Sequence, residues 1–323
     1  MILRTAVIGV GHLGKQHARI HAALAQEGRS QFAGVCDIDQ ARVNEIANQY
    51  NVSAGSDWRD LIGRVDAVSI AVPTESHAEI ACGLLEEGVH VLVEKPIART
   101  VAEADAMLAS AAKSGAILQV GHTERFNPAM IALQPHVRAP VYFEIHRVGQ
   151  FSARSLDIDV VLDLMIHDLD IVQWLVGANV EVTNVHAVGI PILTNRVDAA
   201  NARIEFATGA VANITASRVG TEKIRKMRFF QPRDYVVVDY ANNYASISNL
   251  APSAASPWPG VRTQVLEVND VEPLRAQTES FFDAAINRAS PFVSGEDGRR
   301  ALSLALKTLE QIHEHTVRIG QLF

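Results

Sequence analysis

Hydrophobic residues in the first 122 positions fall into short continuous runs separated by stretches with helical spacing. Continuous apolar runs are typical of strands buried on both faces. The pattern therefore predicts an α/β domain with a doubly wound parallel sheet covered by helices. The predicted strands are Thr5–Ile8, Phe32–Cys36, Asp66–Val72, Val89–Val93 and Ile117–Val120, and the predicted helices are His12–Gln26, Gln40–Gln49, Glu75–Glu87 and Val101–Lys113.

The second half alternates apolar and polar residues, which predicts an α+β domain with one mainly antiparallel open sheet and a single covered face. A helix over Val160–Val176 interrupts the strands and ends at Gly177. A proline- and serine-rich stretch, Asn249–Gly260, predicts a loop. The predicted strands are Val141–Val148, Val180–Val188, Ala199–Phe206, Ala210–Arg218 and Tyr235–Asp239, and the other predicted helices are Pro128–Val137, Glu272–Arg288 and Asp297–Val317. We expect the last helix to pack back on the first domain.

Composition narrows the class of protein. With 323 residues, 48% of them hydrophobic and 20% charged, the chain is a globular protein of about two domains. A net charge of −7 argues against a nucleic-acid binder. Cys36 and Cys82 both lie in apolar stretches, which excludes a disulfide scaffold and favours a reducing cytoplasm. No apolar run approaches the length of a membrane-spanning helix, so we expect no membrane partner.

A glycine-rich turn, Gly9-Val10-Gly11-His12-Leu13-Gly14, links the first predicted strand to the first helix. In this context the first glycine allows the tight turn, the second the approach of a pyrophosphate, and the third close packing of helix on strand. Asp37 ends the second strand, where a carboxylate binds a ribose diol and repels a 2′-phosphate. These residues predict NAD as the cofactor, in preference to NADP. The alternative is an ordinary strand–helix turn beside a surface acid.

The carboxyl ends of the other strands should line the same crevice, because ligands of open α/β sheets bind there. We therefore assign residues 1–123 to an NAD-binding Rossmann domain, and residues 124–323 to a substrate-binding and oligomerisation domain. The further residues expected around the cofactor are Pro73, Thr74, His77, Glu94, Lys95 and His122.

Lys95 is a candidate for chemistry because it follows the Val89–Val93 strand, within Glu94-Lys95-Pro96. An ammonium group there can stabilise the oxyanion that develops when an alcohol loses its proton. The alternative is a solvated loop lysine. The sequence leaves the isomer of the Lys95–Pro96 bond open.

The helix that contains His167 is the most informative part of the second half. Asp163 and His167 are four residues apart, so they share a helical face, and Asp170 neighbours His167 from three positions further on. The apolar residues between them indicate a largely buried helix, where polar groups are costly unless paired or used. Imidazole suits removal of a proton from a secondary alcohol. A core histidine and half of a metal site are the alternatives, but no nearby histidine or cysteine completes a ligand set, so we expect no metal.

Together, the glycine turn, Asp37, Glu94-Lys95-Pro96 and the Asp163/His167/Asp170 helix resemble the Gfo/Idh/MocA oxidoreductase family over nearly the whole chain. The resemblance implies an NAD-dependent dehydrogenase that acts on a CH–OH group of a sugar or cyclitol. It also implies that Lys95, Asp163 and His167 form the catalytic group, with His167 as acid and base. Many members carry glycine where this chain has Met165, which narrows the space beside the cofactor or shifts the substrate.

Two stretches, Gly121–Ala129 and Asp163–Asp168, resemble the branch of this family that acts on UDP-N-acetylglucosamine-type sugars. That resemblance implies oxidation of UDP-N-acetylglucosamine to its 3-keto form, before an aminotransferase on the route to amide-linked lipid A. A chain of net charge −7 must gather local cations to hold a diphosphate. The residues expected to bind substrate are Lys95, Arg125, Asn127, Arg154, Asp163 and His167.

Two other functions stay open. One is an inositol or aldose dehydrogenase with the same catalytic group. The other is a non-catalytic NAD-binding sensor, which we would expect to lose the lysine or the histidine. We also expect a homodimer or homotetramer, because the outer face of the Val180–Arg218 strands, if apolar, must be buried.

Overall fold

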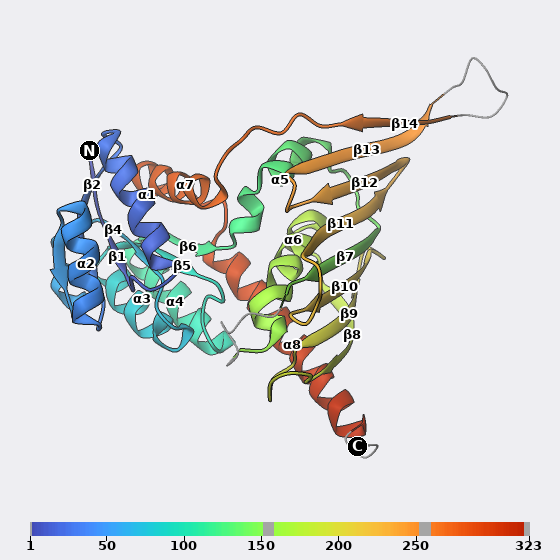
Figure 1. Cartoon of the computed structure of the whole chain (residues 1–323), viewed down its shortest axis with the longest axis horizontal. Coiled ribbons are helices and arrows are strands. Elements are labelled where there is room, and N and C mark those ends of the chain that lie inside the picture. Colours follow the sequence, from blue (N-terminus) through green and yellow to red (C-terminus); the bar gives the residue numbers. More distant parts are fainter. Residues whose placement is uncertain (1, 151–157, 252–259, 320–323) are drawn as a thin grey trace. The chain divides into compact units, whose positions relative to one another are not determined.

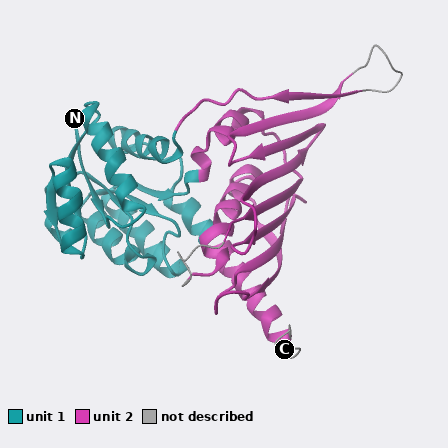
Figure 2. Cartoon of the chain, in the orientation of Figure 1, with its two compact units in different colours: residues 1–123, 272–302 teal, residues 124–271, 303–323 magenta. Residues whose placement is uncertain are grey.

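The computed structural model describes residues 2–150, 158–251 and 260–319. The chain divides into two compact units (Figure 2). Unit 1 consists of residues 1–123 and 272–302, and unit 2 of residues 124–271 and 303–323. Unit 1 thus includes a segment from the last quarter of the sequence. The roles assigned from the sequence to residues 1–123 and 124–323 stay predictions.

Unit 1 contains a six-stranded sheet in which every neighbouring pair of strands is parallel (Figure 1). The order is β3-β2-β1-β4-β5-β6, so the chain moves outward from β1 and then returns to its other side at β4. The predicted doubly wound sheet is confirmed. The strands are β1 (Leu3–Ile8), β2 (Ser30–Cys36), β3 (Ser53–Gly55), β4 (Ala67–Ile70), β5 (His90–Glu94) and β6 (Leu118–Gly121).

The helices of unit 1 follow the strands as the sequence predicts. They are α1 (Gly14–Gln26), α2 (Gln40–Tyr50), α3 (His77–Glu86), α4 (Val101–Ser114) and α7 (Pro273–Asn287), with short turns η1 (Trp58–Leu61) and η2 (Thr74–Ser76). Asp39 caps α2 by accepting a hydrogen bond from the Arg42 amide, and Thr100 caps α4 in the same way. Strand β3 was not predicted, because its three residues, Ser-Ala-Gly, do not form an apolar run.

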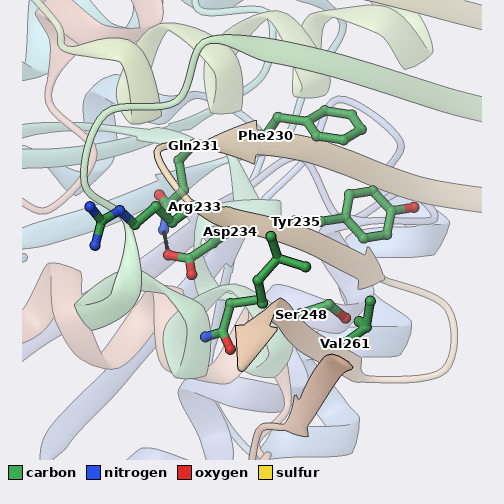
Figure 3. A pocket seen from close by; sticks show the side chains of 9 residues that line it. Phe230, Gln231, Arg233, Asp234, Tyr235, Ser248 and Val261 are labelled. Carbon is green, nitrogen blue, oxygen red and sulfur yellow. Dashed lines mark hydrogen bonds between the residues drawn. The ribbon is translucent and has the colours of Figure 1, made fainter. Parts of the chain in front are cut away.

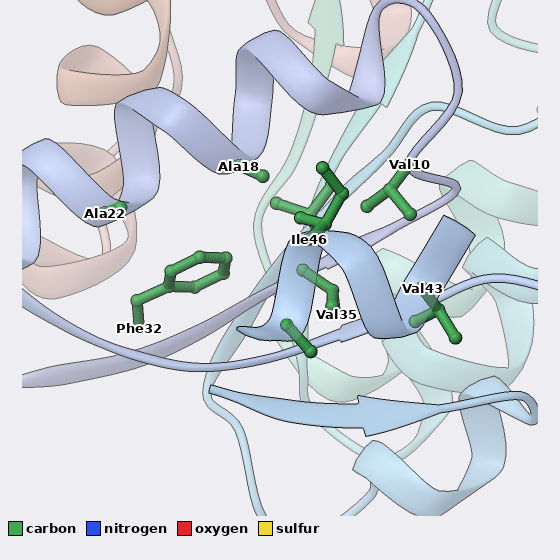
Figure 4. Close-up of a cluster of buried hydrophobic side chains, with 9 residues drawn as sticks. Val10, Ala18, Ala22, Phe32, Val35, Val43 and Ile46 are labelled. Carbon is green, nitrogen blue, oxygen red and sulfur yellow. The ribbon is translucent and has the colours of Figure 1, made fainter. Parts of the chain in front are cut away.

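Apolar side chains from helices and strands form the core of unit 1. Strands β4 and β5 are buried along their whole length, which explains their continuous apolar runs. Figure 4 shows a cluster in which Ala18 and Ala22 of α1 and Ile46 of α2 meet Phe32 and Val35 of β2. Burying each large side chain contributes about 1.5–3 kcal/mol. This packing fixes the strand ends and the loops that follow them.

Unit 2 contains an eight-stranded sheet with the order β14-β13-β12-β11-β7-β10-β9-β8 (Figure 1). All neighbouring pairs are antiparallel except β7 and β10, which run parallel. The mainly antiparallel sheet is confirmed, with that one parallel pair as a correction. The strands are β7 (Tyr142–Val148), β8 (Val182–Ile190), β9 (Ala199–Phe206), β10 (Val211–Ser217), β11 (Ile224–Gln231), β12 (Asp234–Asp239), β13 (Tyr244–Ala251) and β14 (Gly260–Val265).

Alternation gives this sheet one buried face and one open face. On β7, Phe143 and Ile145 are buried, whereas His146 between Ile145 and Arg147 is exposed. Helix α5 packs against β12 and β13, and a π-helical turn, η5, packs against β10. The remaining helical segments are η3 (Thr123–Phe126), α5 (Pro128–Leu133), η4 (Gln134–His136), η5 (Val161–Met165), α6 (Ile166–Val176) and α8 (Gly295–Ile319).

Strands β11, β13 and β14 are absent from the sequence prediction. The predicted loop Asn249–Gly260 overlaps the end of β13 and the start of β14, and residues 252–259 lie outside the described residues. Strand β11 begins Ile-Arg-Lys-Met-Arg, and its alternation of apolar and polar residues is interrupted because Arg225 occupies an inward position. Among the described residues, no helix combines the length and the apolar character needed to cross a membrane.

Candidate active site

The glycine turn of unit 1 has the geometry that its sequence predicts. Gly9 has a φ of +81°, in the left-handed region that favours glycine. A Cβ added at Gly14 would lie 1.8 Å from the carbonyl oxygen of Gly9, so helix α1 can pack this closely only with glycine there. A Cβ at Gly11 would meet no atom within 4 Å. The space beside Gly11 is therefore open to a pyrophosphate, and His12 and Leu13 are exposed next to it.

Asp37 connects the end of β2 to this turn. Its carboxylate accepts hydrogen bonds from the amide of Val10 at 2.8 Å and from the amide of Asp39 at 2.9 Å. The Arg42 guanidinium approaches the same carboxylate at 3.5 Å. Asp37 therefore holds the turn in place while its charge stays at the strand end, where a ribose diol binds in folds of this type.

The end of β5 presents Lys95 beside a buried acid. The Glu94 carboxylate lies 2.8 Å from Nε2 of His17 on α1, and it also accepts the amide hydrogen of Lys95 at 3.3 Å. Burial alone would raise the pKa of Glu94, but the hydrogen bond from His17 and the charges of His17 and Lys95 lower it. Glu94 is thus an ionised support for the strand end, and its partner His17 is not among the site residues predicted from the sequence. The Lys95–Pro96 bond is cis.

His77, predicted to contact the cofactor, bridges two strand ends. Its Nδ1 lies 3.0 Å from the carbonyl oxygen of Pro96, and its Nε2 lies 3.0 Å from that of Val72. Burial lowers the pKa of His77. The ring therefore ties the segment after β4 to the segment after β5.

The predicted cofactor residues of unit 1 lie at or after the carboxyl ends of its parallel strands. Gly9 follows β1, Asp37 follows β2, Pro73 and Thr74 follow β4, and His122 follows β6. Pro73 is exposed, Thr74 is half-buried and His122 is buried. Parallel strands place these ends at one edge of the sheet, which is the ligand-binding edge of this fold. Binding of cofactor by each of these side chains stays a prediction.

In unit 2, Asp163 and His167 lie on a continuous helix made of η5 and α6, which ends at Gly177 as predicted. The first turn, Val161–Met165, is π-helical, a form that occurs frequently at functional sites. Both side chains are half-buried. Met165, at the position where many family members carry glycine, is fully buried.

Two buried aspartates lie one and three positions after His167, and each is paired with an arginine. Asp168 receives hydrogen bonds from Nε and Nη2 of Arg147 at 2.7 and 2.8 Å. Asp170 receives them from Nε and Nη2 of Arg125 at 2.8 and 2.6 Å. Asp170, which the sequence places next to His167 on the helix, is thus paired with Arg125. Each aspartate neutralises the guanidinium that it binds, because a buried guanidinium without a carboxylate partner would destabilise the fold.

The charges of this network favour its ionised form. Burial alone would lower the pKa of Arg147, but the carboxylates of Asp168 and Glu124 raise it well above its ordinary value. The Glu124 carboxylate lies 2.7 Å from Nη1 of Arg147. Sequence alternation could have indicated this pair, since Arg147 follows Phe143 and Ile145 on the inward face of β7.

The remaining predicted substrate residues have different surroundings. The Arg125 side chain is 3% exposed, and its guanidinium pairs with Asp170 of α6. Asn127 caps α5 by accepting the amide hydrogen of Ala129, and its Nδ2 donates to the carbonyl of Tyr240 at 3.3 Å. Arg154 lies outside the described residues. Substrate binding by these three residues stays a prediction, and the observed contacts of Arg125 and Asn127 are structural.

A separate hollow of about 420 Å³ lies in unit 2 between β11, β12, β13 and β14 (Figure 3). The rings of Phe230 and Tyr235 lie 5.0 Å apart there, and Gln231 donates to Asp234 at 3.0 Å. The candidate catalytic residues do not line it. Within the described ranges, histidine, cysteine and acidic side chains form no group of three that suits a metal ion.

A glycine turn between strand and helix, with an acid at the next strand end, defines unit 1 as a dinucleotide-binding domain. Comparison with family models identifies residues 3–122 as an oxidoreductase-family, NAD-binding Rossmann fold, and residues 136–231 as a GFO/IDH/MocA C-terminal domain. The chain belongs to the GFO/IDH/MocA oxidoreductase family, and NAD is its cofactor.

Individual relatives agree with this assignment. UDP-N-acetylglucosamine 3-dehydrogenase of Acidithiobacillus ferrooxidans is 40% identical over 306 residues, covering 94% of this chain and 96% of that protein. A solved structure of that enzyme matches with a TM-score of 0.90, covering 98% of this chain and 99% of its own. scyllo-Inositol 2-dehydrogenase (NAD(+)) of Bacillus subtilis is 31% identical over 235 residues, 67% of each chain. Levoglucosan dehydrogenase, at 21% identity and a TM-score of 0.86, shares the fold.

Proposed function

We propose that this chain oxidises a ring hydroxyl of a UDP-sugar, and specifically that it converts UDP-N-acetylglucosamine to its 3-keto form with NAD. The observation that carries the proposal is the 40% identity, along nearly the full length of both chains, to a UDP-N-acetylglucosamine 3-dehydrogenase. The presence of Lys95, Asp163 and His167 supports a catalytic protein over a sensor.

The cofactor would be held by unit 1. The open space at Gly11 and the N-terminus of α1 suit the pyrophosphate, and Asp37 suits the ribose diol. When bound, NAD supplies the hydride acceptor. We assign residues 1–123 to this role and residues 124–323 to substrate binding.

The proton leaves by a separate route. In the proposed reaction the C3–H bond breaks as hydride is transferred, and His167 takes the proton of the C3 hydroxyl. Lys95 stabilises the developing alkoxide, and Asp163 orients the imidazole. The carbon is oxidised to a ketone, so that atoms and electrons balance.

Arginines are expected to hold the diphosphate of the substrate. Arg154 is one candidate from the sequence. Arg225 is a second, because it lies opposite Arg147 in the register of β11 and β7, so both side chains leave the same face of the sheet. The side chain of Arg225 is 40% exposed, and its nearest acid, Glu124, is 3.9 Å away.

The arginine assignment has its own test. Arg154→Ala and Arg225→Ala should each raise KM for the UDP-sugar about 10-fold while NAD affinity holds. Arg228→Ala is the matched control, since Arg228 is exposed on the opposite face of the same strand. An unchanged KM in both variants would remove the diphosphate contacts from the proposal.

The substrate is tested by following NADH formation with UDP-N-acetylglucosamine, UDP-glucose, scyllo-inositol and glucose. We expect turnover with UDP-N-acetylglucosamine and a 3-keto product identified by NMR. The second candidate is an inositol dehydrogenase, which the 31% identity to the Bacillus subtilis enzyme favours. Robust NAD reduction with scyllo-inositol, and none with the UDP-sugars, would establish that candidate instead.

The cellular setting is proposed from the same likeness. The protein would act in the cytoplasm on the route to amide-linked lipid A, with an aminotransferase consuming the reactive 3-keto sugar. It would form a homodimer or homotetramer through the open face of β8, β9 and β10, where Val188 and Ile190 are 45% and 41% exposed. Light scattering at micromolar concentration tests the assembly, and a monodisperse monomer contradicts it.

A further inference from the structure

The two arginine–aspartate pairs of unit 2 hold the helix that carries His167. Asp168 and Asp170 lie one and three positions after His167, and each is at most 1% exposed. Arg147 reaches Asp168 from β7, and Arg125 reaches Asp170 from η3. Each arginine uses two nitrogens on two carboxylate oxygens. Such two-point pairs fix direction as well as distance.

The pairs act on different sides of the helix. Successive residues of an α-helix are about 100° apart, so positions 168 and 170 are separated by about 200°. A helix held at two nearly opposite points can neither rotate about its axis nor slide along it without breaking a bond. His167 lies in the arc between the two held positions.

Aromatic rings support both arginines. The Arg125 guanidinium lies 5.3 Å from the centre of the Trp174 ring, which is on α6 itself. The Arg147 guanidinium lies 5.4 Å from the centre of the Tyr240 ring. Arg147 also pairs with Glu124, next to Arg125 in the chain. The two pairs are therefore linked through η3 into one network.

The segment before His167 makes such a support useful. Val161–Met165 is π-helical, and π-turns depart from the regular hydrogen-bond ladder that otherwise sets the register of a helix. The direction of a side chain directly after this turn depends on contacts that lie further along the helix. The arginine–aspartate pairs are the first such contacts after His167.

We infer that Arg147–Asp168 and Arg125–Asp170 form a positioning clamp that aims the His167 imidazole. Arg125 and Arg147 are then positioning residues, a role that replaces the substrate contact predicted for Arg125 from the sequence. The inference rests on the proposed role of His167 as the proton acceptor. Both arginine side chains are 3% exposed, and each makes a two-point pair with an aspartate of α6. A misplacement of the base by about 1 Å is enough to cost about 100-fold in rate.

The test separates aim from stability. Asp168→Asn and Asp170→Asn should each lower kcat about 10- to 100-fold, with KM for UDP-N-acetylglucosamine and the Kd of NAD within about 3-fold of wild type. Phe229→Leu is the control, because Phe229 is buried on β11 of the same sheet and its truncation costs stability without touching the clamp. It should lower Tm and leave kcat of the folded protein unchanged.

A triple variant keeps the inference testable where a single one fails to fold. Arg147→Met with Asp168→Leu replaces the pair by apolar side chains, an exchange that often preserves or raises stability, and Glu124→Gln removes the charge that would otherwise lose its Arg147 partner. We expect Tm near wild type and kcat still reduced about 10-fold or more. Recovery of both Tm and kcat would show that the pair only fills space, and would overturn the inference.

A substrate-independent measurement distinguishes failure of the clamp from failure of the proposed function. Wild-type protein is first assayed with UDP-N-acetylglucosamine, and absence of turnover there rejects the substrate alone. The imidazole signal of His167, assigned in NMR spectra with His167→Gln, should be a single sharp line in the wild type. It should shift or broaden in the two aspartate variants. An unchanged line together with unchanged kcat would reject the clamp.

Discussion

The glycine turn of unit 1 and the His167 helix of unit 2 are built by opposite means. In the turn, backbone groups form the proposed binding surface, and the absence of side chains at Gly9, Gly11 and Gly14 gives it its shape. In the helix, charged side chains from distant elements hold the structure, with two arginines bound to two buried aspartates. A backbone site therefore leaves a compact motif in the sequence. A site built by side-chain pairs leaves residues scattered over the chain.

The two units also differ in how they satisfy buried polar side chains, because unit 1 holds a buried histidine in its neutral form. The buried His21 of unit 1 has Nδ1 3.0 Å from the Thr5 hydroxyl and Nε2 2.9 Å from the Ser69 hydroxyl. Burial lowers the pKa of His21 to about 3, so the imidazole is neutral in the folded protein. Around the His167 helix, unit 2 instead buries guanidinium and carboxylate groups in pairs. Mild acid should therefore affect the two regions differently.

The largest effect is expected where each region supplies a group for chemistry. His167→Ala and Lys95→Ala should each lower kcat by about 10²–10⁴-fold with the affinity for NAD largely retained, because proton removal and alkoxide stabilisation occur in the transition state. Steady-state kinetics and NAD titration measure both quantities. His146→Ala, at an exposed position of β7, is the matched control. If His167→Ala turned over at a near-normal rate across pH, Lys95 would become the candidate base.

The backbone character of the first region is tested by two glycine variants. Gly14→Ala places a Cβ against the carbonyl of Gly9, so it should destabilise the NAD-free protein by about 1–3 kcal/mol and weaken NAD binding. Gly11→Ala should leave Tm of the NAD-free protein unchanged. It should weaken NAD binding about 10-fold or more, because its Cβ enters the open space proposed for the pyrophosphate. Thermal unfolding with and without NAD measures both. Equal effects of the two variants would contradict this division of roles.

The neutral histidine of unit 1 predicts an acid-dependent loss of stability. Unfolded histidine has a pKa of about 6.5, above the folded value of about 3, so the unfolded state binds more protons between these values. The contribution of His21 is fully present above pH of about 6.5 and is lost as pH falls toward 3. From pH 7 to pH 5 the loss is about 2 kcal/mol. Urea unfolding should show this slope in the wild type and a shallower one in His21→Gln, with parallel slopes as the contrary result.

The smallest effect is expected at Asp37, where a charge acts on the cofactor. Asp37→Asn keeps an oxygen that can accept the Val10 amide hydrogen, but removes the charge that repels a 2′-phosphate. The ratio of NADP to NAD affinity should rise about 10-fold, equal to about 1.4 kcal/mol. Asp39→Asn, a change at the cap of α2, should leave the ratio unaltered. Tighter binding of NADP than NAD by the wild type would remove the argument from Asp37.

Several features of this protein were determined by short stretches of sequence. Continuous apolar runs predicted five of the six strands of the first sheet, and the Gly9–Gly14 turn with Asp37 predicted a dinucleotide site at their carboxyl ends. Residue spacing also placed Asp163 and His167 on one helix that ends at Gly177. These features depend on neighbours within a few turns or one strand, so periodicity and turn chemistry are sufficient to indicate them.

Other features were decided only by the tertiary structure. The parallel pairing of β7 with β10, the inward position of Arg225 and the π-turn before His167 leave no local signal. In the clamp, Arg125 pairs with an aspartate 45 residues away in the chain, and Arg147 with one 21 residues away. The sequence shows that Arg125 and Asp170 carry opposite charges, but many such pairs exist in one chain. Which two charges meet in a dry interior depends on the packing of whole elements, because only there does an unpaired charge cost enough to select its partner.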